Sequence, residues 1–260
     1  MEGLFGHAGR LSCLFGRVLV GCIKPPYRLR QIAEQMEQIG VHSIPITVLT
    51  ALFTGMVLVL QTAIALTRYG VQEQSGGISA VAFARELGPV LTAVILSGRV
   101  GAGIAAEVGT MKVTEQIDAM RTLATDPVHY LAVPRFIAAM VMLPVLCVFS
   151  NFIGFAGGYA VGVYHVGIPS GLFIQTAVNR VHISDLVSGL AKTPLFGMII
   201  AVVGCYQGFE ATGGAEGVGR ATTRAVVTAS IMVLVTNYLQ TDLIVRYGGV
   251  VGKLLRGLLL

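Results

Sequence analysis

Charged side chains next to or inside apolar runs are the residues of this chain with the clearest chemical potential. Arg85 and Glu86 directly precede the apolar run Leu87–Ala106. Lys192 lies within a second run, Leu186–Phe209. A charge at membrane depth is costly, so it normally faces a cavity or an opposite charge. Two interpretations stay open: these residues orient a helix bundle as ion pairs, or they form part of a polar path for a substrate.

Arg99 and Glu107 belong to the same stretch as the first pair. Their separation of eight positions places them two turns apart on one face of a helix. We therefore expect them to share that face and to pair with side chains of other spans.

The longest polar stretch between apolar runs extends from Glu107 to Pro127. Its composition is compatible with a helix throughout, and Ile117, Met120 and Leu123 form a short apolar edge. The charged residues along it that we expect to meet a partner are Lys112, Glu115, Asp118 and Arg121. We predict a short helix over about residues 110–125 that lies on the cytoplasmic face and docks a soluble partner. A plain solvated connector is the alternative.

Composition excludes most soluble architectures. Hydrophobic residues make up 54% of the 260 residues and charged residues only 12%. Soluble domains carry about 25% charged residues. The net charge of +5 is better explained by basic loops that set membrane orientation than by nucleic-acid binding. The chain is predicted to be an all-α, multi-pass integral membrane protein.

Five apolar runs are each long enough to cross about 30 Å of hydrocarbon. The predicted spans cover residues 44–66, 87–106, 136–164, 186–209 and 225–245. Together they define a membrane domain over residues 44–245, followed by a tail over residues 246–260. In the third span, Gly154, Gly158 and Gly162 repeat every four residues, which lets helices approach closely.

Residues 1–43 are predicted to form an amphipathic, interfacial amino-terminal region. One helical stripe is apolar and a second is basic, and Pro25 and Pro26 end the helix. The apolar stripe contains Leu4, Ala8, Leu11, Phe15, Val18 and Cys22, and the basic stripe contains Arg10, Arg17 and Lys24. Such a helix lies in the headgroup layer, where anionic lipids attract it. More Lys and Arg fall on the side of the amino terminus, so that side is predicted to be cytoplasmic.

Motifs for catalysis or nucleotide binding are incomplete. Residues 214–221 resemble a phosphate-binding loop, but Arg220 replaces its Lys and Ala221 its Ser or Thr. The sequence contains neither His-Glu-x-x-His nor Gly-x-Ser-x-Gly. We therefore expect no catalytic residues, no metal site and no cofactor. The four cysteines, Cys13, Cys22, Cys147 and Cys205, are predicted to be reduced thiols.

Several ungapped motifs occur in a recognisable order. They are Arg85–Pro89, Ala106–Met111, Thr114–Met120, Asp126–Pro127, Pro134–Arg135 and Gly219–Val227. In these motifs the sequence resembles the MlaE/YrbE permeases over roughly residues 31–245. The tail from Tyr247 onward departs from the family pattern.

The resemblance implies the permease subunit of an ATP-driven phospholipid transporter in a bacterial inner membrane. In that family, two copies pair around a cavity below a periplasmic ring of MCE-domain proteins, and lipid is exchanged with the outer membrane. A separate ATPase subunit hydrolyses ATP, and some assemblies contain a STAS-domain protein. The resemblance places Arg85, Glu86 and Lys192 at the lipid cavity. It assigns residues 110–125 to the coupling helix, with Lys112, Glu115, Asp118 and Arg121 facing the ATPase.

Two other functions remain alternatives from the residues alone. A stand-alone secondary carrier or channel needs broken helices or acidic ion sites at the midplane, for which Glu86 and Asp242 are the candidates. A membrane scaffold without transport accounts for the glycine packing but leaves the intramembrane charges unexplained. Co-purification with an ATPase subunit separates the first function from both alternatives.

The predicted orientation can be tested with single cysteines in a cysteine-free background. Cysteines at positions 116 and 214 should be shielded from an impermeant thiol reagent in intact cells, because both positions fall on the predicted cytoplasmic side. A cysteine replacing Gln72 should be labelled. Labelling at position 116 from outside would contradict the orientation.

Overall fold

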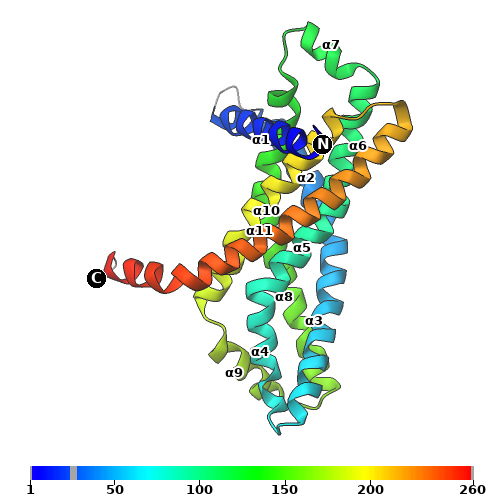
Figure 1. Cartoon of the computed structure of the whole chain (residues 1–260). Helices are drawn as coiled ribbons and strands as arrows, with labels where there is room; N and C mark the ends of the chain where they lie inside the picture. Colours follow the sequence, from blue (N-terminus) through cyan, green and yellow to red (C-terminus); the bar gives the residue numbers. More distant parts are fainter. Residues whose placement is uncertain (1, 24–27, 259–260) are drawn as a thin grey trace.

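The computed structural model describes residues 2–23 and 28–258, and every regular element in those ranges is a helix (Figure 1). Five helical segments are long and apolar enough to cross a membrane. They are Leu29–Thr67, Gln72–Val113, Val128–Tyr164, Ile183–Phe209 and Gly214–Arg246. The prediction of an all-α membrane protein with five spans is therefore confirmed.

Several long helices, among them α3 and α8, run alongside one another and α11 crosses them obliquely, with α7 at one end of the bundle and α9 at the other (Figure 1). The α-helices are α1 (Glu2–Ile23), α2 (Leu29–Ile39), α3 (Ile44–Thr67), α4 (Ser75–Ala82), α5 (Gly88–Leu96), α6 (Ala102–Val113), α7 (Gln116–Thr122), α8 (Val133–Tyr164), α9 (Ser170–Arg180), α10 (Ile183–Phe209) and α11 (Gly214–Leu258). Short 3₁₀ segments are η1 (Val41–Ser43) and η2 (Gln72–Gln74), and π-helical segments are η3 (Phe83–Leu87), η4 (Ser97–Gly101) and η5 (Val128–Ala132).

The second span is longer than the sequence predicts. We expected it over residues 87–106, with Arg85 and Glu86 at its outer end, whereas α4, α5 and α6 form one helical run interrupted by η3 and η4. The first residues of this run are small or polar, so their mean hydropathy is too low for the sequence to mark them as part of a span. They are nevertheless buried: Ser75, Gly76, Gly77 and Ser79 belong to α4, which packs against α9.

The charged pair consequently lies within the length of the second span and not at its end. The ring of Phe83, the first residue of η3, packs against Gly154 of α8. Gly154 in turn packs against Gly55, which is central in α3. The π-helical segment that carries Arg85 and Glu86 therefore passes the middle of the neighbouring spans.

Glycines allow these close helix contacts. A Cβ at Gly158 would lie 2.6 Å from Val59, and one at Gly162 would lie 2.5 Å from the ring of Phe173. A Cβ at Gly154 would collide with the ring of Phe83. Each of the three glycines predicted from the repeat therefore lies where α8 contacts another helix. Gly154 meets η3, Gly158 meets α3 and Gly162 meets α9.

Helix α1 lies across the long helices (Figure 1) and packs against the bundle. Leu14 and Val18 are buried, and Val18 is fully inaccessible. The part of the apolar stripe whose side chains are described, Leu11, Phe15, Val18 and Cys22, therefore packs on protein, because α8, α10 and η5 lie beneath it. Among the described side chains of α1, Leu19, Val20 and Ile23 are large apolar residues that stay exposed. Lys24, Pro25 and Pro26 fall outside the described residues.

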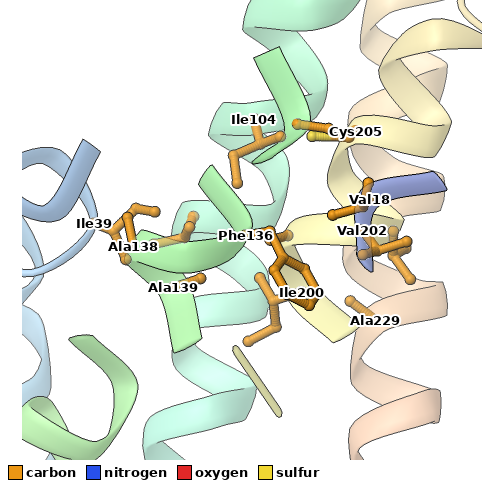
Figure 2. Packing of buried hydrophobic residues seen from close by; sticks show 14 of the residues in the cluster. Val18, Ile39, Ile104, Phe136, Ala138, Ala139, Ile200, Val202, Cys205 and Ala229 are labelled. Carbon is orange, nitrogen blue, oxygen red and sulfur yellow. The ribbon is translucent and has the colours of Figure 1, made fainter. Parts of the chain in front are cut away.

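The main core gathers toward the α7 end. Figure 2 shows Phe136 of α8 facing Ile200 of α10, with Val18 of α1 close to Val202. Ile39 of α2 meets α8 on another side. A smaller cluster around Phe173 holds α9 against α3 and α8 at the opposite end. Helix α11 is continuous to Leu258, so the predicted tail over residues 246–258 extends the helix of the fifth span.

Candidate functional site

The ammonium group of Lys192 lies at the centre of the intramembrane polar network. Its Nζ donates to Glu86 Oε1 at 2.6 Å, to Thr241 Oγ1 at 2.8 Å and to the backbone oxygen of Arg85 at 3.3 Å. The Lys192 side chain is only 3% exposed. Its three N–H groups therefore find three acceptors, which is what an ammonium ion shielded from water requires.

Glu86 joins the second span to the fifth. Asn237 Nδ2 donates to Glu86 Oε2 at 3.1 Å, and Thr241 Oγ1 lies 3.1 Å from Oε1. Both partners are on α11, whereas Lys192 is on α10. The Glu86 side chain remains 37% exposed. The carboxylate thus ties three spans together while one side of it stays accessible.

Arg85 is held by a partner that we did not predict, Asp185. Arg85 Nε and Nη2 donate to Asp185 Oδ1 at 2.8 and 2.5 Å. Asp185 is 2% exposed, and its Oδ2 accepts the backbone N–H of His182 at 3.0 Å. The Arg85 side chain is 53% exposed. Its orientation is therefore fixed from the buried side, while much of the guanidinium stays accessible.

A local sequence signal for Asp185 exists. His182 and Asp185 form a reciprocal cap at the first turn of α10, directly before the apolar run. A carboxylate in that turn also interacts favourably with the helix dipole. This signal predicts a helix start, but it does not predict that Arg85, 100 positions earlier, would be the second partner.

The π-helical segment η3 sets the geometry of both charged residues. Such segments insert an extra residue into a helix and often occur at functional sites. Arg85 turns toward the start of α10, while Glu86 turns toward α11. Gly189 makes the approach of α10 possible, because a Cβ there would collide with the backbone oxygen of Ala84.

Arg99 and Glu107 form a separate polar region nearer to α7. Arg99 Nη1 donates to Ser43 Oγ at 2.6 Å, and Glu107 pairs with Arg135 at 2.7 Å. Both predicted residues line one groove of about 570 Å³ between α2 and α6, and each contacts a different element of the bundle. They are not in contact with the Lys192 network. Arg135, which directly precedes the predicted third span, is 3% exposed and forms the buried side of its pair with Glu107.

Three of the four predicted coupling residues, Lys112, Asp118 and Arg121, form an ion cluster at the α6–α7 turn. Asp118 accepts from Lys112 Nζ at 2.9 Å and from Arg121 Nη1 at 3.0 Å. The hydrogen bond from Lys112 holds the pKa of Asp118 below its usual value. Asp118 therefore stays ionised, and keeps its pairs with Lys112 and Arg121, to a lower pH than an unpaired aspartate would.

The helix predicted over residues 110–125 is interrupted. Helix α6 ends at Val113, and Glu115 takes the left-handed conformation with φ of 62° before α7 begins. The apolar edge is also divided: Ile117 is fully buried and holds α7 to the bundle, while Leu123 is 77% exposed. Glu115 and Leu123 are thus the predicted residues best placed to meet another protein.

The described residues contain no group of three or more His, Cys, Asp or Glu that could hold a metal ion. All four cysteines are free thiols, as predicted. The mid-span site instead offers fixed charges between apolar helices, with Arg85 as its most accessible cation. Such a site suits electrostatic contact with an anionic group and not covalent chemistry.

Comparison with known proteins identifies the family. The family described as "Permease MlaE" matches residues 32–243. The chain belongs to the MlaE permease family. A probable ABC transporter permease of Rickettsia typhi is 43% identical, covering 93% of this chain and 94% of the relative. One from Synechocystis is also 43% identical and covers 86% of each chain. Protein TRIGALACTOSYLDIACYLGLYCEROL 1, chloroplastic, of Arabidopsis thaliana is 36% identical over 90% of this chain and 67% of the relative.

The family and its relatives define the general function. The protein is a multi-pass membrane permease of an ABC transporter. A permease of this class is a transport component that works with an ATP-binding subunit. This finding favours the first of the three functions considered from the sequence over a stand-alone carrier or a scaffold.

The burial of Lys192 predicts an asymmetric response to breaking its ion pair. Glu86→Gln should lower the free energy of unfolding by about 3 kcal/mol, because it leaves a buried ammonium ion without its counter-charge. Lys192→Met should cost less, since the half-buried Glu86 keeps Asn237 and Thr241 as donors. The double variant should recover much of the loss. Thermal and denaturant unfolding of the purified protein in detergent measures all three.

Glu34→Gln is the matched control for this series, because it removes an exposed pair with Arg30 and should change little. Equal destabilisation by Glu86→Gln and Lys192→Met would contradict the asymmetry.

Proposed function

We propose that the protein is the permease subunit of an ATP-driven transporter that moves phospholipids between the bacterial inner membrane and the periplasmic or outer-membrane side. The observation that carries this proposal is the mid-span position of Arg85. Its half-exposed guanidinium is fixed by the buried Asp185, next to the neutralised pair of Glu86 and Lys192. A phospholipid offers the matching chemistry, a phosphate group between apolar tails.

Several features support a lipid cargo. The planar guanidinium of Arg85 can contact two phosphate oxygens at once. The surroundings of a lipid must be mostly apolar with few fixed charges, and the spans around this site provide such walls. The Arabidopsis relative carries the name of a galactolipid, which also favours a lipid over an ion or a soluble metabolite.

Half-exposed charges at mid-span also support pairing of two copies of the chain. Arg85 is 53% exposed and Glu86 37% exposed within one chain. Direct contact of such groups with hydrocarbon is costly, whereas a shared, partly hydrated cavity between two copies removes that cost. A ring of MCE-domain proteins would receive the lipid at the α9 end of this pair.

The ATP-binding subunit is proposed to dock at the α7 end, which is then cytoplasmic. Leu123 offers an exposed apolar side chain, and Glu115 offers a charge at the turn before α7. Asp118 is engaged with Lys112 and Arg121 and serves to hold the turn in shape. A STAS-domain protein would belong to the same cytoplasmic side.

The cargo path is tested by removing the phosphate-binding cation without leaving a buried charge unmatched. The double variant Arg85→Gln/Asp185→Asn keeps neutral hydrogen-bonding groups at both positions. We expect it to retain stability and to lower the phospholipid recovered per folded complex about tenfold, the loss of one charge-assisted contact. Mass spectrometry of bound lipid and thermal unfolding on the same preparations measure the two quantities.

Arg180→Gln, which removes an exposed cation at the α9 end, is the matched control. The single variant Arg85→Ala should destabilise the protein because it orphans Asp185. Unchanged lipid content in the double variant would exclude Arg85 from the cargo path.

Docking is tested by the double variant Glu115→Lys/Leu123→Ser. Both side chains are exposed, Glu115 directly before α7 and Leu123 directly after it, so the variant should insert and pair normally but recover much less ATP-binding subunit. Glu73→Lys makes the same charge reversal on an exposed residue at the opposite end and should leave recovery unchanged. Normal recovery and normal ATP-dependent transport in the double variant would argue against docking at α7.

A further inference from the structure

A second cationic region lies at the α7 end, away from the mid-span site. A groove of about 710 Å³ separates α1 from the connection between α7 and α8. Leu14 and Phe209 contribute apolar surface to it, and Tyr206 lies at the end of α10 beside Arg10. The groove is therefore amphipathic, with arginines along its walls.

Three guanidinium groups from two elements line this groove. Arg10 and Arg17 project from α1, and Arg121 projects from α7. Their side chains are 55%, 61% and 60% exposed, so solutes can reach all three. Guanidinium groups have five N–H donors each, which is more than one carboxylate contact uses.

The carboxylates in the groove do not balance these charges. Glu210 lies 3.6 Å from Arg10, and Asp126 lies 3.1 Å from Arg17. Arg121 contacts Asp118, which is outside the lining and is shared with Lys112. Three cations against two lining anions leave a net charge of +1 in the groove. A phosphodiester, with one negative charge, would neutralise it.

We propose that this groove binds a phosphate-bearing anion, with Arg10 and Arg17 of α1 and Arg121 of α7 as its ligands. The anion is bound through charge-assisted hydrogen bonds in which guanidinium groups act as paired donors. Bound there, a phosphate group bridges α1 to α7 and restrains the element proposed to meet the ATP-binding subunit. The inference does not depend on the mid-span cargo path, because the two sites share no residue.

The anionic headgroup of a membrane lipid is one source of such a phosphate. Leu19, Val20 and Ile23 leave an apolar surface on α1 that is typical of a helix lying in the headgroup layer. Anionic lipids are concentrated in the cytoplasmic leaflet, where basic residues attract them. A free phosphate ester is the other source, and it offers the same ligand chemistry.

The test measures retention of phosphatidylglycerol by the full-length protein. The wild type and the variant Arg10→Gln/Arg17→Gln/Arg121→Gln are reconstituted in phosphatidylcholine nanodiscs with increasing phosphatidylglycerol, and bound lipid is counted by native mass spectrometry after extraction. We expect the variant to lose retention at least about tenfold, because it removes the charge-assisted hydrogen bonds that hold the phosphate. Arg30→Gln, at an exposed pair outside the groove, should retain lipid like the wild type.

A second variant strengthens the groove. Asp126→Asn/Glu210→Gln removes the competing carboxylates, while the amide introduced in place of the Asp126 carboxylate still offers an oxygen to the backbone N–H of Val128. This variant should retain more phosphatidylglycerol than the wild type. Its gain of binding cannot arise from misfolding, so it remains informative if the triple variant is unstable.

Competition identifies the source of the phosphate. Millimolar inorganic phosphate is added to the protein that retains phosphatidylglycerol, and the retained lipid is counted again. Retention that does not change supports a lipid ligand, whereas displacement of the lipid supports a soluble phosphate ester at the same three arginines. Equal lipid retention by the wild type and the triple variant, together with no gain in the carboxylate variant, would overturn the proposal.

Discussion

The need to neutralise charge inside the membrane governs how these helices are arranged. Lys192 is 3% exposed, and its ammonium group reaches acceptors on η3 and α11. A buried ion of this kind is tolerated only when its counter-charge and its other hydrogen-bond partners are all in place. α10, α11 and the second span must therefore meet at one point, and Gly189 allows the backbones to come close enough.

Charge is used differently at the α7 end of the bundle. Arg10 pairs with Glu210 and Arg17 pairs with Asp126, and each of these side chains is more than two-fifths exposed. Exposed ion pairs of this kind typically contribute only about 0–1 kcal/mol each. They can exchange partners at little cost, whereas the pair of Lys192 and Glu86 cannot. The bundle thus combines a fixed polar point at mid-span with adaptable contacts where other molecules are proposed to bind.

The charged residues of the mid-span site could be predicted from the sequence more completely than the side chains that pair with them. Arg85, Glu86 and Lys192 stand out because charges are rare in apolar runs, and the structure places all three within one region. Asp185 was missed because its pairing with Arg85 depends on tertiary contact, and the sequence marks it only as a cap for α10. The start of the second span was also missed, since small polar residues such as Ser75 and Ser79 are buried by helix packing and not by their own hydrophobicity.

The second span joins the two regions physically. Glu86 lies in η3 and Lys112 lies near the end of α6, and the intervening residues form one helical run. At 1.5 Å per residue this run is about 40 Å long, and it connects the α6–α7 turn to the mid-span network through a continuous backbone. The π-helical segment η4 interrupts the α-helical hydrogen bonding between them and holds Arg99 against Ser43. Energetic coupling needs an element with two discrete arrangements. η4 is a suitable place for such an element, because an inserted residue can shift the helical register without breaking the helix.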